Sequence, residues 1–122
     1  MFNIAYNGIV TVNRGDSFEL PLSLNVGTSL YTLDYILAEC DHVYFGLMEP
    51  NQPFETAIVR KVLTHADQHE DGKLYIRFWP EDTRLLLPGK YYYQVKLQTV
   101  DAATGRKDVE TIVDKTLFYI EE

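Results

Sequence analysis

A strongly alternating stretch follows Pro88-Gly89, and it constrains the fold more than any other part of the sequence. Two sets of side chains alternate along it. One set is Tyr91, Tyr93, Val95 and Leu97, and the other is Tyr92, Gln94, Lys96 and Gln98. Side chains in a β-strand point alternately to opposite faces, so the first set would form a dry face. The stretch therefore predicts a half-buried β-strand around which the rest of the chain packs.

Other segments show the same apolar or β-branched patterning and are bounded by turn residues; they are 8–13, 18–24, 42–49, 56–64, 73–79 and 109–122. Segment 80–84 begins with Pro and carries acids in its first turn, which predicts one helical turn. Segment 25–41 favours an irregular connection, with a helical turn or extended strands as the alternatives. No long amphipathic helix is predicted. The pattern favours an all-β, antiparallel β-sandwich of about seven strands.

The helical turn at 80–84 leads into the tyrosine-bearing strand. This order resembles the crossing between strands E and F of immunoglobulin-like domains, where a tyrosine hydrogen-bonds back across the corner. Tyr91 or Tyr93 would be that residue. We therefore expect an immunoglobulin-like, Greek-key sandwich, although the Cys and Trp pattern of antibody domains is absent.

Length and charge narrow the possible functions. A chain of 122 residues predicts a single domain, 1–122, with one real core. Its formal charge of −7 argues against nonspecific nucleic-acid binding and against anionic membrane surfaces. Cys40 is the only cysteine, so no internal disulfide can form. No secretory signal and no run of about 20 apolar residues is present, so we expect a soluble protein without a membrane partner.

Two segments resemble metal sites, and for both a structural interpretation is favoured. His65 and His69 are four residues apart, but they follow a predicted strand, and no third ligand is indicated. The acidic segment 67–72 lacks the oxygen ligands that a calcium loop needs at its third and twelfth positions. We interpret it as a hairpin turn. No metal and no cofactor is predicted.

No catalytic group is predicted either, and the chain is interpreted as a non-enzyme. Cys40 and His42 are close in sequence, but an extended segment does not orient them as a dyad. The tripeptide at 14–16, Arg-Gly-Asp, matches a sequence read by integrin-type receptors. Gly-Asp is also ordinary turn chemistry, so a turn is the favoured interpretation.

Outward-facing residues of two strands are the interface candidates; they are Tyr75, Trp79, Tyr92, Gln94 and Lys96. If 73–79 and 90–98 lie in separate sheets, these residues cannot form one patch. If the strands meet at a sheet edge, the aromatic strip would serve as a protein interface or a sugar-stacking platform. Partial burial under loops is the alternative.

Four motifs in order carry a family resemblance: Gly-Asp-Ser-Phe at 15–18, the aromatic strand and proline turn at 43–51, Asp-Gly-Lys-Leu at 71–74, and the Pro-Gly-x-Tyr strand at 87–95. They resemble the immunoglobulin-like N-terminal domain of upper baseplate proteins from tailed bacteriophages, and related small virion proteins. The resemblance covers roughly positions 8 to 120.

The resemblance implies a non-enzymatic building block of a phage particle, in the tail or baseplate or associated with the head. It implies localisation in the virion after assembly in the host cytoplasm, contacts with other virion structural proteins, and a homo-oligomer or multiple copies. It brings no catalytic residues. The alternative is a carbohydrate-binding or host-attachment module that uses Trp79 and the outward tyrosines for stacking.

Overall fold

Residues 3–4, 8–28, 31–34, 36–70 and 73–122 are described by a computed structural model. For 3–4, 23, 25–28 and 31–34 it describes the backbone alone. The strands are β1 (Asn3–Ile4), β2 (Val10–Asn13), β3 (Phe18–Ser23), β4 (Asn25–Thr28), β5 (Tyr31–Asp34), β6 (His42–Met48), β7 (Val59–Leu63), β8 (Lys73–Phe78), β9 (Gly89–Val100) and β10 (Lys107–Glu121). Short helical turns are η1 (Phe54–Thr56), η2 (His65–Asp67) and α1 (Pro80–Thr83).

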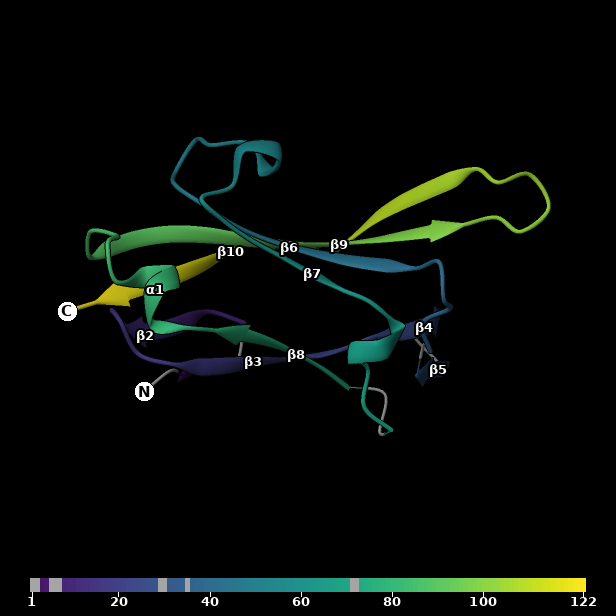
Figure 1. The fold of residues 1–122 in the computed structure, drawn as a ribbon, viewed down its shortest axis with the longest axis horizontal. Coiled ribbons are helices and arrows are strands. Elements are labelled where there is room, and N and C mark those ends of the chain that lie inside the picture. Colours follow the sequence, from purple (N-terminus) through teal and green to yellow (C-terminus); the bar gives the residue numbers. More distant parts are fainter. Residues whose placement is uncertain (1–2, 5–7, 29–30, 35, 71–72) are drawn as a thin grey trace.

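The strands form a sandwich, and Figure 1 shows its two layers. One layer is a six-stranded sheet in the order β1-β2-β10-β9-β6-β7, and the other is the pair β3-β8. The predicted all-β sandwich is confirmed, and each of the seven expected segments contains a strand. The chain moves repeatedly between the layers, as a Greek-key sandwich requires.

The expectation of a purely antiparallel sandwich is wrong for one pair of strands. Strands β2 and β10 run parallel, with Val10 opposite Phe118 and Val12 opposite Ile120. Parallel neighbours need a long connection between them. Here nearly the whole sandwich separates the two strands, so no short hairpin imposes an antiparallel direction.

Two connections also differ from their predictions. Segment 25–41 is not simply irregular, because β4 and β5 pair antiparallel, in agreement with the extended alternative. Its β-branched Val26, Thr28 and Thr32 suit a strand better than a helix. Segment 67–72 does not close a hairpin, because β7 and β8 belong to different layers. The His69 N–H does donate to the Lys73 carbonyl at 2.9 Å, while positions 71 and 72 lie outside the described residues.

The hydrophobic core lies between the layers and centres on aromatic rings. Phe78 of β8 stacks on Phe18 at 4.5 Å between ring centroids and meets Phe45 edge-on at 5.4 Å. Fully burying one such side chain contributes about 1.5–3 kcal/mol. The dry face predicted for β9 is buried, and so are the alternating apolar residues of β8; together they are Leu74, Ile76, Phe78, Tyr91, Tyr93, Val95 and Leu97.

The corner before β9 follows its prediction closely. The helical turn expected at 80–84 is present as α1, and the Tyr91 hydroxyl donates to the Leu87 carbonyl at 2.6 Å. The Tyr93 hydroxyl instead reaches the Gly8 carbonyl, also at 2.6 Å. Tyr91 is therefore the corner tyrosine, and Tyr93 ties β9 to the segment before β2.

The tripeptide at 14–16 forms the predicted turn and is held from two sides. Its Asp16 N–H donates to the Asn13 carbonyl at 3.2 Å, and Gly15 has a φ of 81°. The Gly15 N–H donates to the hydroxyl of the buried Thr83 at 2.9 Å. The Arg14 guanidinium pairs with Glu122 at 2.7 Å. These contacts give the turn a structural role in joining the two layers.

Candidate functional site

The outer face of the six-stranded sheet, the side turned away from β3 and β8, carries three of the five interface candidates. Tyr92, Gln94 and Lys96 of β9 point to this face because their neighbours Tyr91, Tyr93, Val95 and Leu97 fill the core. They lie opposite Met48, Gly46 and Tyr44 of β6. All three are half-buried, and Gln94 donates to the Asp114 carboxylate at 3.2 Å.

Phe54 of η1 covers the middle of the outer face, and Figure 1 shows this loop above the sheet. The ring fits because Gly46 lies beneath it, where a Cβ would be only 2.7 Å from a ring carbon. The ammonium of Lys96 lies 4.8 Å from the centre of the same ring. A glycine inside a strand often marks such a close approach. Phe54 is therefore held between the strand and a cation.

A pocket of about 460 Å³ opens beside Phe54, between η1 and the edge strand β7. We call it the Phe54 pocket, and its lining residues are Tyr44, Phe45, Gly46, Phe54, Glu55, Arg60, Lys61 and Val62. The Arg60 guanidinium donates to the carbonyls of Glu55 and Ala57, which braces the loop. Val62 is 54% exposed. The lining is mainly apolar, as is usual for pockets that receive apolar groups.

The other two interface candidates, Tyr75 and Trp79, lie apart from this face. Tyr75 belongs to β8, and Trp79 follows it in the opposite layer, so the five candidates do not form one patch. Trp79 is 52% exposed, and the Arg77 guanidinium lies over its ring at 4.6 Å. The Tyr75 ring meets His69 edge-on at 4.8 Å.

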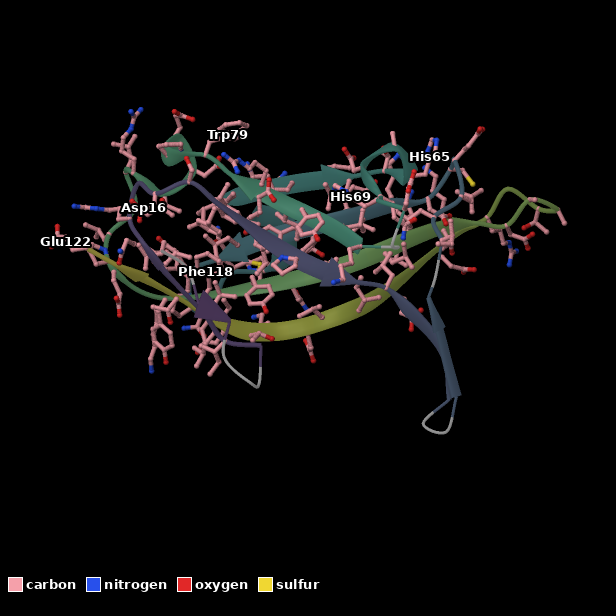
Figure 2. The ribbon with its side chains drawn as sticks, turned by 90° about the horizontal axis from the view of Figure 1, so that it is seen from below. Asp16, His65, His69, Trp79, Phe118 and Glu122 are labelled. Atoms are coloured by element: carbon pink, nitrogen blue, oxygen red, sulfur yellow. The ribbon has the colours of Figure 1, made fainter. Side chains whose placement is uncertain are left out.

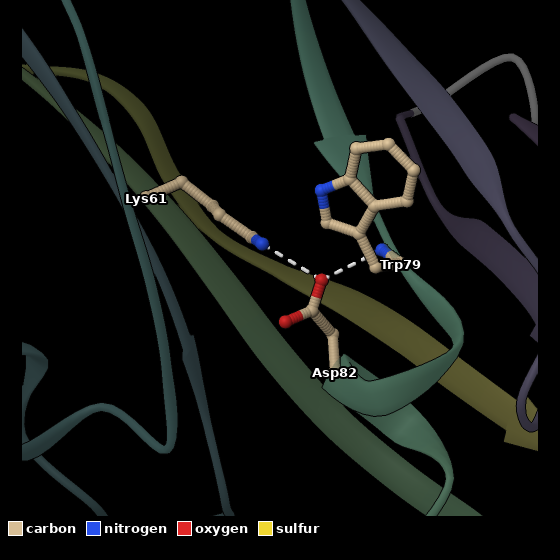
Figure 3. Close-up of polar contacts among 3 residues, drawn as sticks. All are labelled: Lys61, Trp79 and Asp82. Carbon is tan, nitrogen blue, oxygen red and sulfur yellow. Dashed lines mark hydrogen bonds and ion pairs between the residues drawn. The ribbon is translucent and has the colours of Figure 1, made fainter.

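Lys61 and Asp82 form an ion pair beside Trp79 that connects the edge of the large sheet with the corner (Figure 3). The Lys61 ammonium lies 2.7 Å from Asp82 Oδ2, and both side chains are about one-fifth exposed. The same oxygen accepts a hydrogen bond from the backbone N–H of Trp79 at 2.7 Å, which satisfies one of the free backbone donors at the start of α1. The contact is best explained as structural.

The residues considered for metal binding do not gather into a site. Figure 2 shows His65 and His69 in the same half of the molecule, away from Asp16 and Glu122 at the other end. The Asp67 carboxylate accepts the Thr64 N–H at 2.8 Å and so caps η2. Across the described ranges, no group of three His, Cys, Asp or Glu side chains is placed to hold a metal ion.

Cys40 and His42 flank a buried aspartate. The Asp41 carboxylate accepts the Ala38 N–H at 2.9 Å, so it stabilises the turn before β6. Cys40 is exposed, whereas His42 is half-buried with its ring 6.0 Å from that of Tyr44. The His42 Nδ1 has no hydrogen-bond partner among the described residues. The contacts of this segment stabilise the turn that leads into β6.

Two tyrosines of β9 have raised pKa values. Burial, together with the nearby negative charge of Glu49, raises the pKa of Tyr91. Burial also raises the pKa of Tyr93. A buried phenol resists ionisation because the phenolate loses its hydration. Both side chains therefore stay neutral hydrogen-bond donors through the physiological range.

Sequence analysis missed several residues that matter on the surface. Phe54 and Val62 were not singled out, although Gly46 within a strand is a signal for a covering ring. Leu85 and Leu87, between α1 and β9, are 85% and 76% exposed. Three leucines in a row suggest burial, yet only Leu86 packs against the core.

Comparison with family models, curated proteins and solved structures finds no match to the chain. Within the described part of the chain, no helix is long and apolar enough to cross a membrane.

Proposed function

We propose that this chain is a structural component of a bacteriophage particle, in the tail or baseplate or associated with the head, and that it works through protein–protein contacts. The outer face of the six-stranded sheet is the observation that carries the proposal. Its tyrosines and aliphatic residues are half-buried or exposed, and they are Tyr44, Tyr92, Leu117, Tyr119 and Val62. Tyrosine-rich surfaces with an apolar centre are typical of protein interfaces.

Rigidity of the fold also supports this role. The η1 loop is braced by the hydrogen bonds of Arg60, and its Phe54 ring is packed on Gly46, so the centre of the outer face is a packed surface. A preorganised surface loses little conformational entropy on binding, which favours a building block. The phage assignment itself rests on the resemblance of the motifs at 15–18, 43–51, 71–74 and 87–95.

Binding to the proteins encoded by neighbouring genes tests this function. Each neighbour is co-expressed with the chain, and stable complexes are identified by size-exclusion chromatography. We expect at least one complex, weakened by Tyr92→Ala with Lys96→Glu on the outer face. Tyr75→Ala on the opposite layer is the matched control and should bind normally. If no neighbouring protein binds, the proposal fails.

A carbohydrate-binding module is the second candidate, and the exposure of Trp79 favours it. An exposed indole can stack on a sugar ring. Arg77 occupies one side of this indole, however, so a sugar would have to use the other side or displace the guanidinium. Glycan-array binding that disappears in Trp79→Ala would favour this candidate over the structural role.

A further inference from the structure

The turn of α1 presents one side to solvent, and Figure 1 shows it at the same end of the sandwich as the C-terminus. Thr83 is fully buried, so the opposite side of the turn faces outward. The Leu86 N–H donates to the Thr83 carbonyl at 3.0 Å, which extends the turn past α1. Glu81, Arg84 and Leu85 are spaced by three or four positions, so they are neighbours on the outward side, and all three are exposed.

The apolar part of this surface is formed by two leucines. Leu85 and Leu87 are the two most exposed of the large hydrophobic side chains in the described ranges, whereas Leu86 between them packs against the core. Single exposed apolar residues are ordinary, but two large ones on one short turn form a protruding apolar patch. We call Glu81, Arg84, Leu85 and Leu87 together the α1 surface.

Charges of both signs surround the leucines and balance locally, although the whole chain carries −7. Glu81 and Arg84 are three positions apart, where an ion pair can form on a helix, yet neither side chain pairs with any described residue. Lys90 lies opposite Tyr119 of β10, one diagonal step from the exposed Glu121. Two α1 surfaces can therefore approach each other without a net repulsion.

The order of the charges on α1 is complementary to itself. When the α1 turns of two copies lie antiparallel about a two-fold axis, Glu81 of each copy faces Arg84 of the other. The same rotation brings the leucines of both copies together near the axis. A different protein would have to supply these charges in the same reversed order, whereas a second copy supplies them by symmetry.

We propose that two copies of this chain associate through their α1 surfaces about a two-fold axis, with the leucines at the centre and two Glu81–Arg84 pairs beside them. The proposal rests on the proposed function, since it names a second copy as one partner in its protein contacts. A contact that uses the same surface on both copies closes on itself, so assembly stops at the dimer. The surface is small, so the dimer is weak and reversible.

Sedimentation equilibrium of the full chain tests the apolar centre. The dimer fraction of the wild type should rise with concentration up to about 1 mM, the range of a weak contact. Leu85→Ser with Leu87→Ser should remain a monomer. Val109→Ser, at an exposed apolar position of β10, is the matched control and should dimerise like the wild type. The substituted side chains are exposed, and circular dichroism verifies that each variant keeps the fold.

Charge reversal tests the two-fold arrangement. Arg84→Glu and Glu81→Arg each place like charges opposite each other twice, so either variant alone should associate at least about tenfold more weakly than the wild type. In an equimolar mixture of the two variants, every Glu meets an Arg, so dimers should return. Arg106→Glu, in the exposed loop after β9, makes the same change in net charge as Arg84→Glu and should leave the dimer intact.

A monomeric wild type, a leucine variant that still dimerises, a mixture no more dimeric than its components, or growth beyond the dimer would each overturn the proposal. Complexes with neighbouring virion proteins are measured separately and depend on the outer face. A monomeric chain that still binds a neighbour therefore removes this inference and leaves the proposed function standing.

Discussion

The hydroxyl of Tyr91 donates a 2.6 Å hydrogen bond to the carbonyl of Leu87, four residues earlier in the chain. The bond joins the start of β9 to the corner that follows α1. It fixes the backbone just before β9 and closes one end of the sandwich. The same bond is the clearest local sign of an immunoglobulin-like arrangement in this chain.

Tyr91→Phe should lower the free energy of unfolding by about 1–2 kcal/mol, because the ring stays but the Leu87 carbonyl loses its donor. Chemical denaturation of the variant measures the change. Tyr92→Phe is the matched control, since its half-buried hydroxyl faces outward and should contribute less than about 0.5 kcal/mol. Equal effects of the two substitutions would contradict the importance of the corner bond.

Gly46→Ala should destabilise the fold by about 1–3 kcal/mol, because the new methyl group would overlap the ring of Phe54. The penalty should shrink in a Phe54→Ala background, where the ring is absent. A double-mutant cycle measured by denaturation separates this coupling from any other cost of the methyl group. The same penalty in both backgrounds would show that Phe54 does not lie against Gly46.

Asp82→Ala should lower the free energy of unfolding by about 1–2 kcal/mol, because it removes both the acceptor of the backbone N–H of Trp79 and the ion-pair partner of Lys61. Lys61→Met keeps the apolar stem and loses only the charge, so its cost should be about 0–1 kcal/mol. Thermal unfolding compares the two variants. A Lys61→Met effect as large as that of Asp82→Ala would place the stabilisation in the ion pair instead of the start of α1.

Glu122→Gln removes an exposed ion pair whose effect on stability can be compared with that of the partly buried Lys61–Asp82 pair. Glu122 pairs with Arg14 at the same short distance but is well exposed, so its loss should change the stability by less than about 0.5 kcal/mol. This comparison separates the effect of partial burial from that of ion-pair distance.

Alkaline pH should destabilise the protein through Tyr91 and Tyr93. Both pKa values are raised in the folded state, so above the ordinary tyrosine pKa of about 10 the unfolded chain loses these protons first. The stabilisation is complete below that pH and is lost as the pH rises through the folded-state values. Denaturation curves between pH 8 and pH 11, roughly the window around the tyrosine pKa, should show this decline.

The double variant Tyr91→Phe with Tyr93→Phe tests the source of the decline. It should be less stable than the wild type at neutral pH but should lose less further stability on going to alkaline pH. An unchanged slope against pH would assign the alkaline effect to other groups.

Local patterning predicted much of the fold. Leu74, Ile76 and Phe78 alternate with polar residues, and the structure buries all three. A proline and two acids predicted the turn of α1, and the position after that turn narrowed the corner tyrosine to Tyr91 or Tyr93, of which the structure selects Tyr91. These features depend on residues that are close in sequence, where period and turn chemistry are informative.

Features that depend on distant segments were harder to predict. The parallel pairing of β2 with β10 joins the two ends of the chain, and no local signal encodes it. The Phe54 pocket requires a loop ring to fold back onto a strand glycine eight positions earlier. The exposure of Leu85 and Leu87 depends on the corner turning outward, whereas an apolar run alone suggests burial.

Whether the chain works through protein contacts is tested most directly by its mass in solution, measured by light scattering for the chain alone and with each protein encoded by a neighbouring gene. We expect a stable complex of fixed composition with at least one neighbour, weakened by Tyr92→Ala with Lys96→Glu. A mass of 14.1 kDa at every concentration and in every mixture would contradict a role that depends on protein contacts.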